Sequence, residues 1–151
     1  MYASASHDTK PAGLYAQKVR SEAGKQDGLY WSIKPGEKLS PLGELAAQAT
    51  EEGYAAGQNA TPVPFHGYYF RILTAQGKAA AGGAKSYIAN GGLTGGFALV
   101  AWPADYENSG VMTFIVNQEG IVYQKDLGEE TATIASQMKV HNPDKTWKPV
   151  Q

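Results

Sequence analysis

A chain of 151 residues, 42% hydrophobic and 18% charged, has the size and composition of one folded domain, which we expect to span residues 1–151. Its formal net charge of −1, from 13 basic and 14 acidic side chains, excludes the basic footprint of a nucleic-acid-binding protein. The lack of cysteine excludes disulfides, thiol nucleophiles and thiolate metal sites, and no apolar run reaches the roughly 18 residues of a membrane span. Residues 1–6 have neither the basic nor the apolar region of a signal peptide.

Two short helices are predicted in the first third of the chain. Residues 14–20 contain two side-chain pairs spaced four apart and are followed by Gly24, which suits a helix C-cap. The clearer helix runs over residues 40–53, with Ser40 as a good N-cap and Pro41 as a good first helical residue. The i, i+3, i+4, i+7 spacing gives this helix one apolar face, made of Leu42, Leu45, Ala46 and Ala49.

The second half of the chain has the patterns of strands. Aromatic and aliphatic residues alternate over residues 68–73, and β-branched and aromatic residues fill three further segments, 97–102, 111–116 and 121–123. Between the last two, residues 117–120 (Asn-Gln-Glu-Gly) fit a type I turn followed by a left-handed glycine, which is a common hairpin loop. The glycine-rich residues 76–95 predict a long loop with one short strand at 86–88.

A further helix is predicted over residues 129–139, with Ala132, Ala135 and Met138 on one face and acidic residues near its N-terminus. Trp147 in the tail is expected to dock onto the domain. No helix lies between consecutive strands, which disfavours parallel βαβ units. The prediction is an α+β fold, with an antiparallel β-meander of about four strands and flanking helices.

Several segments carry a family pattern, above all residues 65–77 (Phe-His-Gly-Tyr-Tyr-Phe-Arg-Ile-Leu-Thr-Ala-Gln-Gly), 95–104, 110–118, 123–128 and 147–150. With residues 27–31 and 40–43, they resemble an uncharacterised family of secreted bacterial proteins, number twenty-nine-fifty in the domain-of-unknown-function series. The resemblance implies a secreted or periplasmic protein that corresponds to the C-terminal half of members about twice as long. It implies no activity that can be assigned to individual residues.

The architecture carries a second resemblance. The predicted order is a helix, then a variable loop, then a meander whose last two strands are joined by the turn at residues 117–120. This order is similar to that of the globular heads of type IV pilins and type II secretion pseudopilins. This resemblance implies a pilin-head-like fold. The chain lacks the long apolar N-terminal helix of pilins, so we do not expect filament assembly through that helix.

His66 is the candidate catalytic residue, because it opens a strong predicted strand beside Gly67 and a general base needs a ring nitrogen with an orienting partner. Asp105 or Glu107 could supply that partner if the fold brings them together. No Gly-x-Ser-x-Gly nucleophile motif occurs, and a hydrogen-bonding histidine at a sheet edge explains His66 equally well.

Asp105, Glu107 and Asn108 crowd one loop between predicted strands, and Ca²⁺ accepts such carboxylate and amide oxygens. The likeness to pseudopilin heads, which carry calcium in a late loop, implies the same ion here; a solvated polar loop is the alternative. Zinc is not predicted, because no His-Glu-x-x-His or paired-histidine spacing occurs. The glycine-rich residues 91–96 lead into a strand, so they do not predict a phosphate site.

Aromatic residues gather around the meander in the sequence and predict a face that binds carbohydrate, peptide or protein; the candidates are Tyr68, Tyr69, Tyr87, Trp102 and Tyr106. Core packing explains any single one of them as well.

The missing catalytic motifs favour a non-catalytic extracytoplasmic binding or interaction domain, pilin-head-like, whose ligand the sequence does not identify. The alternative is a metal-assisted or convergent hydrolase with a site near His66 and residues 105–108. A third option is a subunit of a cell-envelope assembly, whose sign would be an unpaired, apolar edge strand.

Overall fold

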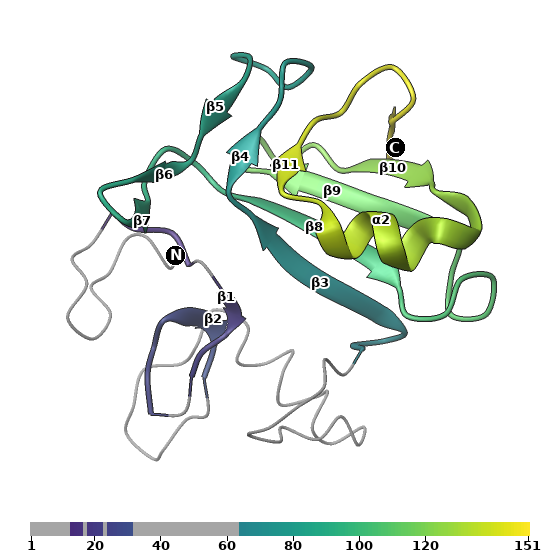
Figure 1. The fold of residues 1–151 in the computed structure, drawn as a ribbon, viewed down its shortest axis with the longest axis horizontal. Helices are drawn as coiled ribbons and strands as arrows, with labels where there is room; N and C mark the ends of the chain where they lie inside the picture. Colours follow the sequence, from purple (N-terminus) through teal and green to yellow (C-terminus); the bar gives the residue numbers. More distant parts are fainter. Residues whose placement is uncertain (1–12, 17, 23, 32–63) are drawn as a thin grey trace.

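The structure is a computed structural model that describes residues 13–16, 18–22, 24–31 and 64–151 (Figure 1). The helix predicted over residues 40–53 lies outside the described residues. Within the described ranges, no helix has the length and hydropathy that a membrane crossing requires.

A five-stranded antiparallel sheet forms the centre of the fold (Figure 1). The four longer strands are neighbours in space in the order of the sequence, although short strands intervene between the first and the second, and a strand from the tail extends the sheet beyond the last of them. In spatial order the strands are β12 (Lys148–Pro149), β10 (Tyr123–Asp126), β9 (Met112–Asn117), β8 (Ala98–Pro103) and β3 (Tyr68–Leu73). The predicted four-stranded meander is confirmed.

The β9–β10 hairpin forms as its sequence predicts. Gly120 has a φ of 79°, and its N–H donates to the Asn117 carbonyl at 3.0 Å. Asn117 Oδ1 accepts a hydrogen bond from the Glu119 N–H at 3.1 Å. Glycine takes the left-handed conformation without Cβ strain, which is why it closes this turn. The paired part of β10 begins at Tyr123 rather than at Ile121, where it was expected.

Short strands occupy much of the glycine-rich segment expected to be a loop. β11, β4 and β5 form a three-stranded sheet, and β6 pairs with β7. These strands are β4 (Ala75–Gln76), β5 (Lys85–Ser86), β6 (Ile88–Ala89), β7 (Gly92–Leu93) and β11 (Val140–His141). The single strand predicted at 86–88 is divided by Tyr87, which is fully buried and donates its N–H to the Thr74 carbonyl at 2.8 Å.

One α-helix is present among the described residues. α2 (Thr131–Gln137) follows a 3-10 turn, η2 (Gly128–Glu130), and both fall on the helix predicted over residues 129–139. The helix ends early because Met138 is extended, with a ψ of 129°, and leads directly into β11. The described fold is therefore mostly β with one short helix, and several flanking helices are not seen.

The helix predicted over residues 14–20 is wrong. β1 (Lys18–Arg20) is instead a strand that pairs in parallel with β2 (Gly28–Tyr30). The helical pattern rests on two i, i+4 pairs, which contribute only about 0.2–0.5 kcal/mol each. Tertiary pairing outweighs them: beyond β1–β2, the Tyr15 N–H donates to the Leu93 carbonyl at 2.7 Å.

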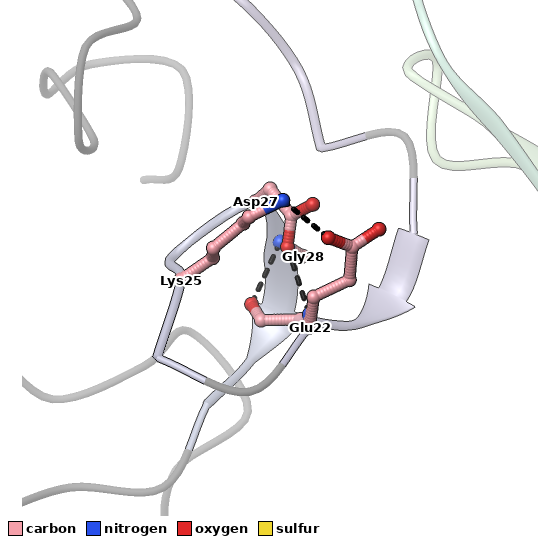
Figure 2. Close-up of polar contacts among 5 residues, drawn as sticks. Glu22, Lys25, Asp27 and Gly28 are labelled. Atoms are coloured by element: carbon pink, nitrogen blue, oxygen red, sulfur yellow. Dashed lines mark hydrogen bonds and ion pairs between the residues drawn. The ribbon is translucent and has the colours of Figure 1, made fainter. Parts of the chain in front are cut away.

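The connection between β1 and β2 spans only residues 21–27, although parallel strands usually need a dozen or more linking residues. Each strand is three residues long, so a short loop can return to the start of the pair. Figure 2 shows how the loop is closed: the Glu22 N–H donates to Asp27 Oδ1 at 3.0 Å, and the Gly28 N–H donates to Ser21 Oγ at 2.8 Å. Lys25 also pairs with the Glu22 carboxylate at the exposed surface (Figure 2), where such pairs contribute at most about 1 kcal/mol. We assign this loop a structural role.

The core lies between α2 and one face of the main sheet, which we call the helix-side face. Figure 1 shows α2 lying over the sheet, where it packs against β8. Arg71 ties the edge strand to the helix, because its guanidinium donates to the carbonyls of Ala135, at 3.3 Å, and Ser136. A cation is favourable at a helix C-terminus. The buried apolar residues between sheet and helix include Leu73, Val100, Trp102, Ile115 and Ala135.

Candidate functional site

Two of the predicted site segments meet at one end of the main sheet, in a region that we call the loop end (residues 65–68 and 104–110). The Ala104 N–H donates to the Gly67 carbonyl at 2.8 Å. A Cβ on Gly110 would lie 2.2 Å from Tyr68 Oη, so the tyrosine packs on bare glycine backbone. The structure thus brings His66 and Tyr68 to the same region as the candidate calcium ligands.

The position of His66 has a structural explanation. His66 and Gly67 have φ values of 46° and 79°, and the flanking Phe65 and Tyr68 exchange two backbone hydrogen bonds of 2.8 and 3.0 Å. Two central residues with positive φ are the pattern of a type I′ hairpin turn. The exposed His66 ring packs against Phe65 with centroids 4.3 Å apart. The catalytic role of His66 stays a prediction.

The candidate calcium ligands lie in a loop closed by its own hydrogen bonds. Asn108 Nδ2 donates to Asp105 Oδ2 at 2.8 Å, and the Asp105 N–H donates to Ser109 Oγ at 3.0 Å. Glu107, with a φ of 69°, donates its N–H to the Gly110 carbonyl at 2.9 Å. Asn108 therefore offers Asp105 a donor, whereas calcium would need its oxygen. Across the described residues, no three His, Asp or Glu side chains gather as a metal site would require, and calcium stays a prediction.

Tyr106 joins the loop end to the end of β10. Its hydroxyl donates to Asp126 Oδ1 at 2.9 Å at the exposed surface. This hydrogen bond to a carboxylate raises the pKa of Tyr106 above its usual range, because losing the proton would set two negative charges side by side. The contact fixes the loop rather than leaving the phenol free for a ligand.

The five aromatic candidates do not form one surface. Tyr87 and Trp102 are core residues, with exposed fractions of 0% and 8%, so their assignment to a binding face is corrected. Tyr69 is half-buried and packs against Trp102, with ring centroids 5.7 Å apart. Tyr68 lies on the other face of the sheet beside Phe114, at 6.0 Å. A ring without access to solvent cannot meet a ligand, which leaves Tyr68 as the candidate best placed on an accessible face.

That face, opposite the helix-side face, is apolar and only partly covered; we call it the open face. Strand alternation and register place on it Tyr68, Phe70, Ile72, Leu99, Ala101, Met112, Phe114 and Val116. Phe70 and Met112 are 39% and 37% exposed. At one corner, Ala16 and Trp31 pack against Ile72. Sequence reasoning missed this face, although residues 68–73 carry apolar side chains in both phases of the alternation apart from Arg71, a sign that both faces of this strand need cover.

Buried polar side chains gather at the other end of the sheet, where β4, β11 and the end of β9 converge. We call Gln76, Tyr87, Asn117 and His141 the buried polar cluster; each is at most 2% exposed. Tyr87 Oη donates to Gln76 Oε1 at 2.8 Å, and Gln76 Nε2 donates to the carbonyls of Ala81 and Gly83. Among the described residues, neither His141 ring nitrogen nor Asn117 Nδ2 has a hydrogen-bond partner. No sequence motif marked this cluster, because its members come from distant segments.

Comparison with known proteins supports the family resemblance. A family profile described as "Protein of unknown function (DUF2950)" matches residues 1–150 of the chain. No curated protein and no solved structure matches the chain, so no structural match supports the likeness to pilin heads.

Proposed function

We propose that this chain, which belongs to the DUF2950 family of proteins of unknown function, is a non-catalytic binding domain that works outside the cytoplasm. The open face is its contact surface, and the partner is a polypeptide with an apolar surface of its own. The extracytoplasmic location rests on the resemblance to secreted bacterial proteins.

The observation that carries this proposal is the chemistry of the open face. An antiparallel sheet with one face on the core usually turns polar side chains outward on the other. Here the outward positions of β3, β8 and β9 are apolar, and Phe70 and Met112 remain exposed. Exposed apolar patches of this kind mark interaction sites, because covering apolar surface contributes about 25 cal/mol per Å².

The composition of the open face also describes its partner. Among the described strands of the main sheet, the charged side chains on this face lie at its rim, where β10 and β12 contribute Asp126 and Lys148. The interior of the face offers the rings of Tyr68, Phe70 and Phe114. Aromatic groups surrounded by a polar rim are the usual anatomy of a protein contact surface, whereas a nucleic acid would require basic groups.

The other interpretations rank below this one. The hydrolase alternative needs a base with an orienting partner, and the hairpin turn is a structural reason for a residue with positive φ at position 66. The envelope-assembly option also stays a prediction: β3 lies at the edge of the main sheet, and among the described residues β1 lies close to it. Such an assembly is one form that the proposed binding function would take. The likeness to pilin heads stays a prediction.

Peptide selection tests the proposal. A random peptide library displayed on phage is selected against the immobilised wild-type protein, and the dissociation constants of the selected peptides are measured in solution. We expect Phe70→Lys and Met112→Lys to weaken binding at least tenfold, because each places a charge in the contact. Ile134→Lys is the matched control: Ile134 is 42% exposed but lies on α2.

Two results would refute the proposal. One is a selection that yields no peptide able to bind the folded protein. The other is a loss of affinity in Ile134→Lys as large as in the two open-face variants, since binding would then not depend on the open face.

A further inference from the structure

His141 sits where the C-terminal segment joins the rest of the fold. In β11 it pairs in parallel with Gln76 of β4, and its carbonyl accepts the Gly77 N–H at 2.9 Å. The Thr74 N–H donates to the Lys139 carbonyl at 3.3 Å. These backbone bonds hold residues 139–141 against β4 and its flanking residues.

The surroundings of the His141 ring suit only its neutral form. The side chain is 1% exposed, and neither ring nitrogen meets a hydrogen-bonding atom in the described part of the chain. Gln76 of β4 pairs with His141 in the sheet, and the Tyr123 ring faces the imidazole with centroids 6.2 Å apart. The charged group that acts on it is Glu119 on the β9–β10 hairpin. A buried imidazolium without hydrogen-bonded partners is costly, whereas a neutral ring is tolerated.

We propose that His141 is a pH-sensitive latch, and that its protonation in acid releases β11 and the following tail from β4 while the central meander stays folded. The released state hydrates the imidazolium and opens the buried polar cluster to solvent. The latch is independent of the proposed binding function, because it lies on the helix-side face and not on the open face.

The direction of the effect follows from proton linkage. Burial lowers the pKa of His141, and the Glu119 carboxylate opposes this in part. The released state, with an ordinary histidine pKa of about 6.5, therefore binds a proton that the latched state does not. The latch is fully stable above that pH and weakens as the pH falls through it. One proton raises the ratio of released to latched molecules by at most about tenfold per pH unit.

Release is expected to be local because the latch is small. β11 and β4 are two residues long and share two residue pairs. The pairing of β8 with β3 extends over six residue pairs, and Val100 of β8 is fully buried. Segments with few paired residues open at a lower free energy than the central strands of a sheet.

Amide hydrogen exchange followed by NMR tests the latch. Protection factors of the Gly77 and Val100 amides are compared at about pH 7.5 and about pH 5.5, on either side of the ordinary histidine pKa. We expect the Gly77 protection factor to fall up to about tenfold in acid while that of Val100 falls less, because the N–H of Gly77 is bonded to residue 141 itself.

Two variants make the test specific. His141→Leu removes the titrating ring and is expected to abolish the acid-dependent loss at Gly77. Thr113→Val is the control: it removes a buried hydroxyl without a described partner and changes no charge, so the acid response should remain. The proposal is overturned if Gly77 keeps its protection in acid, if His141→Leu retains the loss, or if Gly77 and Val100 lose protection equally.

Discussion

Replacing Gly96 with alanine tests whether Tyr87 is a fixed part of the core. Gly96 has a φ of 144°, and a Cβ there would lie 2.9 Å from two Tyr87 ring carbons and 2.7 Å from Gln118 Oε1. The exposed Gln118 can move away, whereas Tyr87 is fully buried and hydrogen-bonded to Gln76. Backbone strain of this kind costs about 1–3 kcal/mol and an overpacked core a further 1–3 kcal/mol. Gly96→Ala should therefore lower the free energy of unfolding by about 2–6 kcal/mol.

Urea denaturation followed by circular dichroism measures this loss, and Gly120→Ala is the matched control. Gly120 also has a positive φ, 79°, but a Cβ there would meet no atom within 4 Å. Its replacement carries the backbone cost alone, about 1–2 kcal/mol. If Gly96→Ala is no more destabilising than Gly120→Ala, the Tyr87 ring yields to the added methyl group, and its description as a fixed core residue is refuted.

Two further predictions concern polar contacts. Arg71→Met should lower the free energy of unfolding by about 1–2 kcal/mol, because it removes charged hydrogen bonds to the carbonyls of Ala135 and Ser136. The loss is limited because the substitution also removes a buried Nε that has no described partner. Thermal denaturation measures the effect, and an unchanged melting temperature would contradict it. Asp126 raises the pKa of Tyr106, so Tyr106→Phe should remove one phenol that ionises at high pH from a spectrophotometric titration. In Asp126→Asn, the Tyr106 phenol should ionise at lower pH. An unchanged midpoint of the Tyr106 ionisation in this variant would contradict the assigned cause.

The strands of the meander could be predicted because their local and tertiary preferences agree. Residues 68–73 are rich in aromatic and aliphatic side chains, and β3 has those bounds. The turn at residues 117–120 sets the pairing of β9 with β10, because Gly120 adopts a positive φ and the Asn117 side chain accepts a hydrogen bond within the turn. The structure of a segment can be predicted from sequence alone when its propensity, periodicity and turn chemistry agree.

The short strands could not be predicted, because their partners are distant in sequence. β12 pairs with β10, and β11 pairs with β4, across more than twenty residues in the first case and more than sixty in the second. A two-residue strand has no periodicity of its own and is defined only by the tertiary contact. The failed helix at residues 14–20 has the same cause, since weak local pairs yielded to strand pairing with residues 28–30.

The candidate site residues could be selected from the sequence, but their arrangement could not be predicted. Sequence reasoning selected His66, Tyr68 and residues 105–108, and the fold brings them to the loop end. It could not know that the Asn108 amide would donate to Asp105, or that Tyr87 would be buried. Hydrogen-bond direction and burial are decided by three-dimensional packing, which residue types and spacing do not encode.

The alternation of β9 explains why the two unassigned features of this protein are physically separate. Thr113, Ile115 and Asn117 point to the helix-side face, where His141 is also buried, while Met112 and Phe114 point to the open face. Titration on the helix-side face changes a charge inside the protein, and the interior of the open face contains no group that titrates near neutral pH. If the affinity for a peptide changes between about pH 7.5 and about pH 5.5, the protonation of His141 must therefore act on the open face through the strands of the sheet. The affinity change shows that the latch and the contact surface are coupled, and an unchanged affinity shows that they are not.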